Sequence, residues 1–149
     1  MRFASLASGS SGNATFVHSG DTRILIDNGL TLTTLTRRLE AIGERTENLD
    51  AVVVTHAHGD HTNGLNVLVK NSIRRGRPLP VWLSEGTAER IDWQGIERPP
   101  LICFDAGKSF VIGDIEVSSL TVMHDCVSPV GYCLADNRSR FGIATDLGF

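Results

Sequence analysis

The sequence is poor in several features that mark particular classes of protein. Among its 149 residues there are only three cysteines, and aromatic side chains make up 6%. An odd number of irregularly spaced cysteines does not suggest a disulfide framework, so we expect reduced thiols. The longest apolar runs, such as Ala51–Val54, are far too short to span a bilayer, and no apolar leader follows Met1. We therefore expect a cytoplasmic protein with no membrane segment and no signal peptide.

An excess of positive charge is also missing. The formal net charge is -3 and the pI is about 5.9. This balance argues against a non-specific polycation for nucleic acid or anionic membranes, but it leaves room for a local basic groove. The spacing of Trp82 and Trp93 does not suggest a base-stacking platform, so we expect both in the core. With 41% hydrophobic and 21% charged residues, the composition is that of an ordinary globular protein.

The order of strand and helix patterns predicts an α/β fold. The sequence has no internal repeat, low-complexity tract or linker, so residues 1–149 are expected to form one domain. Apolar residues recur at helical spacing from Leu32 to Ile42, and Gly43 stands where a C-cap is expected. Further helices are predicted at 62–75 and 87–93, and strand patterns lie at 3–6, 14–18, 23–27, 50–55, 81–83, 101–104, 109–112, 115–123, 130–135 and 140–145. Strands, crossover helices and a final meander predict a mixed sheet with helices on its faces.

Three of the five histidines lie close together, with an aspartate, in the segment His56-Ala57-His58-Gly59-Asp60-His61. It directly follows the apolar strand pattern at 50–55. His56 and His58 are two residues apart, so they project to the same side and both imidazoles can reach one ion. Asp60 and His61 lie one turn further and can reach a second ion. Imidazole and carboxylate ligands suit zinc, manganese or ferrous iron. The alternative interpretation is a polar loop or histidines of the core.

This motif resembles the signature of the metallo-β-lactamase superfamily, His-x-His-x-Asp-His. Further segments are similar, in the same order, to the YycJ/WalJ group of that superfamily. They are the opening Ser5–Thr15, the strand end Ile24–Leu30, the continuation His61–Leu65, and the later segments Thr121–Asp125 and Gly142–Gly148. The resemblance covers the whole chain. It implies the αββα sandwich fold, of which this sequence would be the N-terminal half.

The resemblance also implies a site for two divalent metal ions, zinc or manganese. The ligands implied for the first ion are His56, His58 and His124, and those for the second are Asp60, His61 and the bridging Asp146. The group is associated with metal-dependent nucleases, and close relatives cleave small cyclic phosphodiesters. A bridging hydroxide would attack phosphorus, and Asp60 would orient it as the catalytic carboxylate. The expected partner is therefore nucleic acid or a small phosphodiester.

Two other segments have a functional and a structural interpretation. The glycine loop, Ser8–Asn13, could bind a substrate phosphate through backbone N–H groups and the side chains of Ser10, Ser11 and Asn13, or it could be a plain loop. The basic stretch at 70–77 either contacts a nucleic-acid backbone or is the solvated end of a helix. 

Two single residues near the expected metal centre are also open to interpretation. Asp27, at the end of a predicted strand, is expected to orient the metal loop through hydrogen bonds or to be structural. Cys126 lies two residues after His124, so its thiol either reaches the metal or packs as a semi-buried side chain.

The sequence departs from the superfamily pattern at its end. It stops at Phe149, three residues after Asp146, where the second half of the superfamily fold would begin and would supply a last histidine for the second ion. We therefore expect a weak second metal site and an apolar inner sheet face left exposed, to be covered by a second copy or a complementing chain. The leading hypothesis is a metal-dependent phosphodiesterase or nuclease. The alternatives are an inactive or partner-dependent fragment, and thioester or lactam hydrolysis.

Overall fold

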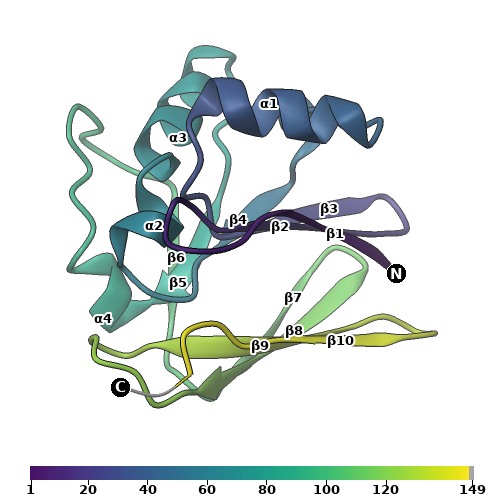
Figure 1. Cartoon of the computed structure of the whole chain (residues 1–149), viewed down its shortest axis with the longest axis vertical. Helices are drawn as coiled ribbons and strands as arrows, with labels where there is room; N and C mark the ends of the chain where they lie inside the picture. Colours follow the sequence, from purple (N-terminus) through teal and green to yellow (C-terminus); the bar gives the residue numbers. More distant parts are fainter. Residues whose placement is uncertain (148–149) are drawn as a thin grey trace.

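The computed structural model describes residues 1–147, which form two β-sheets packed face to face with helices on the outer side of the first sheet (Figure 1). The first sheet has the order β1-β2-β3-β4-β5-β6 and the second β10-β9-β8-β7. The strands are β1 (Arg2–Ala7), β2 (Ala14–Ser19), β3 (Thr22–Ile26), β4 (Ala51–Val53), β5 (Val81–Ser84), β6 (Leu101–Phe104), β7 (Ser109–Ile112), β8 (Ile115–Thr121), β9 (Val130–Ala135) and β10 (Arg140–Ile143). The helices are α1 (Leu32–Ala41), the 3-10 turn η1 (Thr46–Asn48), α2 (Gly59–Thr62), α3 (Leu65–Arg74) and α4 (Glu85–Ala88).

The first sheet is mixed, and its parallel half positions the site. Strands β1, β2 and β3 pair antiparallel, whereas β3, β4, β5 and β6 pair parallel. Parallel strands end at the same edge of a sheet, so the loops that follow β3, β4 and β5 gather at one edge. All three residues of β4 are buried, as expected for a central strand covered on both faces.

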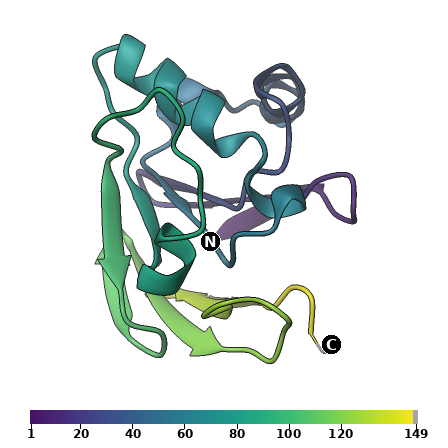
Figure 2. The same cartoon turned by 90° about the vertical axis from the view of Figure 1, so that its left-hand side faces the viewer.

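Helices α1 and α3 cover the outer face of the first sheet (Figures 1 and 2). The predicted first helix is confirmed, and Thr31 caps it by accepting a hydrogen bond from the backbone N–H of Thr34. Of its predicted apolar positions, Leu35 and Leu39 are buried, whereas Ile42 lies just past the end of the helix and is exposed. The helix predicted at 62–75 is interrupted at Gly64, because the N–H of Gly64 bonds to the carbonyl of Asn28 and not to the preceding turn. The helix predicted at 87–93 is wrong, because α4 ends at Ala88.

The strands from Ser109 onward form a second sheet, which differs from two expectations stated above. The strand patterns after residue 109 do not extend the mixed sheet but form a separate antiparallel sheet. The inner face of the first sheet is therefore not exposed, because this chain covers it. The core between the sheets buries Val17, Ile24, Ile26, Ala51 and Val53 from the first sheet against Ile112, Ile115, Val117, Val130, Tyr132 and Leu134 from the second. Each large apolar side chain buried here contributes about 1.5–3 kcal/mol to folding.

A side-chain hydrogen bond crosses this core from one sheet to the other. The hydroxyl of Tyr132, on β9, donates to the carbonyl of Val54, just beyond β4. Burial raises the pKa of the Tyr132 phenol well above its usual range, so it remains a donor. This bond fixes the second sheet against the strand that leads into the histidine motif. Among residues 1–147, no helix is both long and apolar enough to cross a bilayer.

Candidate metal centre

The histidine motif lies at the edge of the sandwich where the parallel strands end. His56 and His58 follow β4, and His61 lies on the single turn α2. His124 comes from the loop between β8 and β9, and Asp146 follows β10. The two sheets thus each supply residues to one cluster, which includes His61 of α2. The packing of the two sheets is what brings residues 56 and 146 together.

Three imidazoles form the first group of potential ligands. Nitrogen atoms of His56, His58 and His124 all lie within 4.8 Å of one another. The Nε2 atom of His124 is 3.2 Å from Nδ1 of His58. This is the set that the sequence predicted for the first ion. Three imidazoles with space for a further ligand are typical of a catalytic zinc site.

The second group shares a member with the first. Ligand atoms of His56, His61 and Asp146 also lie within 4.8 Å of one another. Oδ2 of Asp146 is 2.8 Å from Nε2 of His61 and 3.6 Å from Nε2 of His56, so this carboxylate lies next to the histidine that the two groups share. The Asp60 side chain is at the margin of the group, with its Oδ2 3.4 Å from Nε2 of His61. The structure therefore brings His56 nearer to the second group than the sequence predicted, and leaves Asp60 further out.

Asp27 determines the orientation of His61. It follows β3 with a φ of 60°, a left-handed backbone conformation that is uncommon outside glycine. Its Oδ1 accepts the backbone N–H of Thr55, and its Oδ2 accepts the Thr55 hydroxyl and the Nδ1–H of His61, each at 2.8 Å. With the proton on Nδ1, the lone pair of Nε2 points toward Asp146. The expectation that Asp27 orients the metal loop agrees with this geometry. The hydrogen bonds of Thr55 to Asp27 were not predicted, because the only sequence signal for Thr55 is its position before His56.

The pKa values of Asp27 and His61 are both raised, whereas that of His56 is lowered. Burial raises the pKa of Asp27, against the lowering effects of His61 and Thr55. Burial opposes protonation of His61, but the hydrogen bond and charge of Asp27, together with Asp60 and Asp146, outweigh it and raise the pKa of His61. Burial, followed by the neighbouring imidazoles of His61 and His58, lowers the pKa of His56 to about 4. His56 is therefore neutral near pH 7, as a metal ligand must be.

The environment of His56 provides a test of whether a cation fits. The Thr55 hydroxyl, which donates a hydrogen bond to Asp27, lies 3.0 Å from Nδ1 of His56 and can accept a hydrogen bond from an N–H at that atom. The opposite atom, Nε2, is buried and has no hydrogen-bond partner among the described residues. A buried polar atom without a partner costs about 1–3 kcal/mol. An unpaired imidazole lone pair facing two more imidazoles and a carboxylate is a chemically suitable environment for a divalent cation.

The glycine loop lies beside this cluster, but its predicted substrate residues differ in position. Ser10 and Ser11 are exposed at its tip. Asn13 is partly buried, and its side chain is engaged within the protein, with Nδ2 3.0 Å from the carbonyl of Gly9 and 3.1 Å from Oδ2 of Asp60. Ser10 and Ser11 therefore stay candidates for substrate contact, whereas the contacts of Asn13 point inward.

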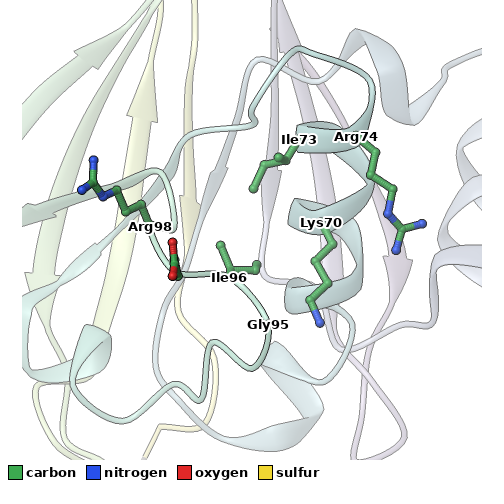
Figure 3. A pocket seen from close by; sticks show the side chains of 7 residues that line it. Lys70, Ile73, Arg74, Gly95, Ile96 and Arg98 are labelled. Carbon is green, nitrogen blue, oxygen red and sulfur yellow. The ribbon is translucent and has the colours of Figure 1, made fainter.

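The basic stretch divides into paired and unpaired residues. Arg75 forms an ion pair with Glu47 at 2.8 Å and Arg77 one with Asp50 at 2.9 Å. Lys70 and Arg74 instead line a hollow between α3 and residues 95–98. In Figure 3, Ile73 and Ile96 face this hollow, and Arg74 and Arg98 extend to opposite sides of it. None of the residues predicted for the metal centre lines it, so the hollow is separate from the candidate site.

Residues next to His124 take no part in either ligand group of the described chain. Asp125 is 68% exposed, and its Oδ1 lies 3.3 Å from Nδ1 of His124. Burial, with the charges of Asp125 and Asp146, raises the pKa of the Cys126 thiol. Because Cys126 belongs to neither ligand group and is partly buried, its interpretation as a semi-buried packed thiol is favoured.

Comparisons with known proteins place the chain in a family. Residues 22–149 match the model of the beta-lactamase superfamily domain. Exodeoxyribonuclease WalJ of Streptococcus pneumoniae is 32% identical over 158 residues, and Exodeoxyribonuclease YycJ of Bacillus anthracis is 32% identical over 155 residues. Each match covers 100% of this chain and 55% of the relative, so the chain spans about half the length of these curated relatives.

A solved structure gives the same result for the fold. The metallo-beta-lactamase fold protein YhfI from Bacillus subtilis superposes with a TM-score of 0.76 at 19% sequence identity, covering 96% of this chain and 58% of that protein. The likeness extends over both sheets and the outer helices, since almost the whole chain is covered. Taken with the match over residues 22–149, the chain belongs to the beta-lactamase superfamily.

Proposed function

We propose that the chain carries the metal centre of a metal-dependent phosphodiesterase that acts on DNA. The observation that supports this most directly is the pair of ligand groups that share His56, with the Asp146 carboxylate 3.6 Å from Nε2 of that shared histidine. Two adjacent sites of this kind are typical of enzymes that cleave phosphodiesters. The substrate class comes from the two relatives that are named exodeoxyribonucleases. A small cyclic phosphodiester is the second candidate substrate.

The residues have distinct roles in this proposal. His56, His58 and His124 would hold one divalent ion, and Asp60, His61 and Asp146 the other, with Asp146 shared. Zinc or manganese held there would supply Lewis acidity toward a phosphate oxygen and toward water. The Asp60 carboxylate, whose side chain is 29% exposed, would orient the attacking water by accepting a hydrogen bond from it.

Other side chains of the protein would orient the ligands and contact the substrate. Asp27 holds His61 in the tautomer that keeps Nε2 available, and Thr55 fixes both Asp27 and His56. The exposed hydroxyls and backbone N–H groups of Ser10 and Ser11 would donate hydrogen bonds to the non-bridging oxygens of the phosphate. A weaker second metal site, completion by a second copy or another chain, and a cytoplasmic location stay predictions of the sequence.

The test is cleavage of a labelled DNA oligonucleotide by the purified chain with zinc or manganese. We expect cleavage that stops on chelation and returns with added metal. His58→Ala should reduce the cleavage rate by at least about 100-fold. Loss of a hydrogen-bond partner of a metal ligand can already cost that much, and here a ligand itself is lost. The matched control is His18→Ala, because His18 lies on β2 and contacts Gly20 and Glu44 instead of the cluster.

The alternatives give different results in the same assay. Cleavage that survives chelation, or that His58→Ala leaves unchanged, would contradict the proposal. An inactive or partner-dependent chain would bind one metal ion or none, and would cleave neither DNA nor a cyclic nucleotide. Hydrolysis of a thioester or lactam with no effect on phosphodiesters would point to the third hypothesis.

A further inference from the structure

Helix α2 carries two of the proposed ligands but is too short to hold itself in place. It has four residues, Gly59–Thr62, and a single helical turn is unstable alone. Two of its backbone carbonyl groups accept hydrogen bonds from loops outside the helix. The backbone N–H of Asn13 donates to the carbonyl of Asp60 at 2.7 Å, and that of Asn28 donates to the carbonyl of His61 at 2.8 Å. The loops after β1 and β3 therefore clamp the turn that presents Asp60 and His61.

The Asn13 side chain adds a second set of contacts. Its Nδ2 lies 3.1 Å from Oδ2 of Asp60, 3.1 Å from Nε2 of His61 and 3.0 Å from the carbonyl of Gly9. Its Oδ1 accepts the backbone N–H of Gly9 at 3.1 Å. One amide group thus contacts two proposed metal ligands and both backbone groups of a residue in the glycine loop.

These contacts suit positioning better than substrate binding. An amide nitrogen has two hydrogens, and here the Gly9 carbonyl and Asp60 Oδ2 can take both. A hydrogen bond to one lone pair of Oδ2 leaves another for a cation, so the bond orients the carboxylate without consuming it. The bonds to Gly9 close the loop at a residue with a φ of 113°, a conformation that only glycine adopts readily.

We propose that Asn13 is a positioning residue that couples the glycine loop to the metal centre by fixing the Asp60 carboxylate with one side of its amide and Gly9 with the other. This inference rests on the proposed function, because it assumes that Asp60 serves a metal ion. It reassigns Asn13 from substrate binding to support of a ligand. It also implies that a change that makes the glycine loop less ordered also weakens binding of the second ion.

Three substitutions separate the parts of this role. Asn13→Ala removes the side-chain bonds but keeps the backbone bonds of residue 13 to Asp60 and Gly29, so the chain should still fold. Asn13→Asp keeps an oxygen that can accept the Gly9 N–H but places a carboxylate oxygen against Asp60. Ser8→Ala is the matched control, because Ser8 is an exposed residue of the same loop whose side chain has no proposed role.

The primary measurement is zinc binding by calorimetry, with hydrogen exchange of the loop amides as the second readout. For Asn13→Ala we expect about 10–100-fold weaker binding of the second ion, the range typical for loss of a ligand's hydrogen-bond partner, with faster exchange at Gly9. For Asn13→Asp we expect an equal or larger loss of affinity with near-normal exchange at Gly9. Ser8→Ala should leave both quantities unchanged.

Other outcomes would overturn the inference and are distinct from failure of the proposed function. If Asn13→Ala binds zinc like the wild type but cleaves DNA poorly through a raised KM, Asn13 contacts substrate and the positioning role is wrong. If Asn13→Asp binds zinc as tightly as the wild type, the amide donor has no part. If the wild type cleaves no phosphodiester, the proposed function fails, but the zinc isotherms and exchange rates still decide whether Asn13 positions Asp60.

Discussion

Oδ2 of Asp27 lies 2.8 Å from Nδ1 of His61, and both side chains are almost fully buried. The aspartate accepts three hydrogen bonds on two oxygens, two from Thr55 and one from His61. This arrangement leaves a single orientation and a single tautomer for the imidazole, with Nε2 toward Asp146. A residue that touches no substrate thereby determines which nitrogen of His61 is available to a cation.

Asp27→Asn tests this relationship. An asparagine has one acceptor oxygen, so if that oxygen accepts the Thr55 N–H, the amide nitrogen faces Nδ1 of His61 and favours the proton on Nε2. We expect about 10–100-fold weaker zinc binding, measured by calorimetry. Asp92→Asn, at an exposed aspartate that accepts a bond from Gln94, is the control and should bind zinc normally. Normal zinc affinity in Asp27→Asn would show that the tautomer of His61 is set elsewhere.

Gly29→Ala tests the close approach between the loop after β3 and α2. A Cβ atom at residue 29 would lie 1.9 Å from the carbonyl oxygen of Asp60, and backbone cannot move aside as a flexible side chain does. We expect a loss of at least about 1–3 kcal/mol in the free energy of unfolding, measured by urea denaturation, and weaker metal binding. Gly142→Ala is the control, because a Cβ there meets no atom within 4 Å. Equal stability of the two variants would contradict the expected clash.

The spacing of residues in the sequence predicted the local part of the centre, whereas the ligands that sheet packing brings in, His124 and Asp146, came only from the family resemblance. The segment from His56 to His61 is contiguous, so its spacing alone indicated ligands that reach neighbouring ions. The inward role of Asn13 depends on the pairing of a distant loop with α2, which no local pattern reveals. The similarity that led to Asp146 gave its place near the centre, but not the distances to His56 and His61.

The error about the second sheet has a clear physical origin. Strand β8 alternates buried and exposed residues over much of its length, which indicates one covered face but not what covers it. The strand patterns predicted a single mixed sheet, and the second sheet was expected only from the missing half of the fold, so the inner face was expected to be exposed. In the structure, Ile115 and Val117 point into the space between the sheets and pack on that face. Which sheet a strand joins is decided by long-range packing, and the pattern within the strand is the same in either case.

Tyr132→Phe tests the bond between the sheets. The change removes the hydroxyl that donates to the carbonyl of Val54 and leaves that carbonyl without this donor in a dry core. We expect a loss of about 1–3 kcal/mol in the free energy of unfolding, with an unchanged denaturant m-value because the buried apolar surface is retained. A variant as stable as the wild type would mean that the ring, and not the hydroxyl, joins β9 to the strand before the histidine motif.

Metal stoichiometry tests the order of the two ligand groups. The three-imidazole group is complete with His56, His58 and His124, whereas the other relies on Asp146, whose side chain is 41% exposed. We expect one ion per chain to remain after dialysis, measured by plasma emission, and a second only with metal in the buffer. His124→Ala should lose the retained ion and Asp146→Ala should keep it, with His18→Ala as the control. Loss of the retained ion in Asp146→Ala, with retention in His124→Ala, would reverse the order and make the carboxylate group the tighter site.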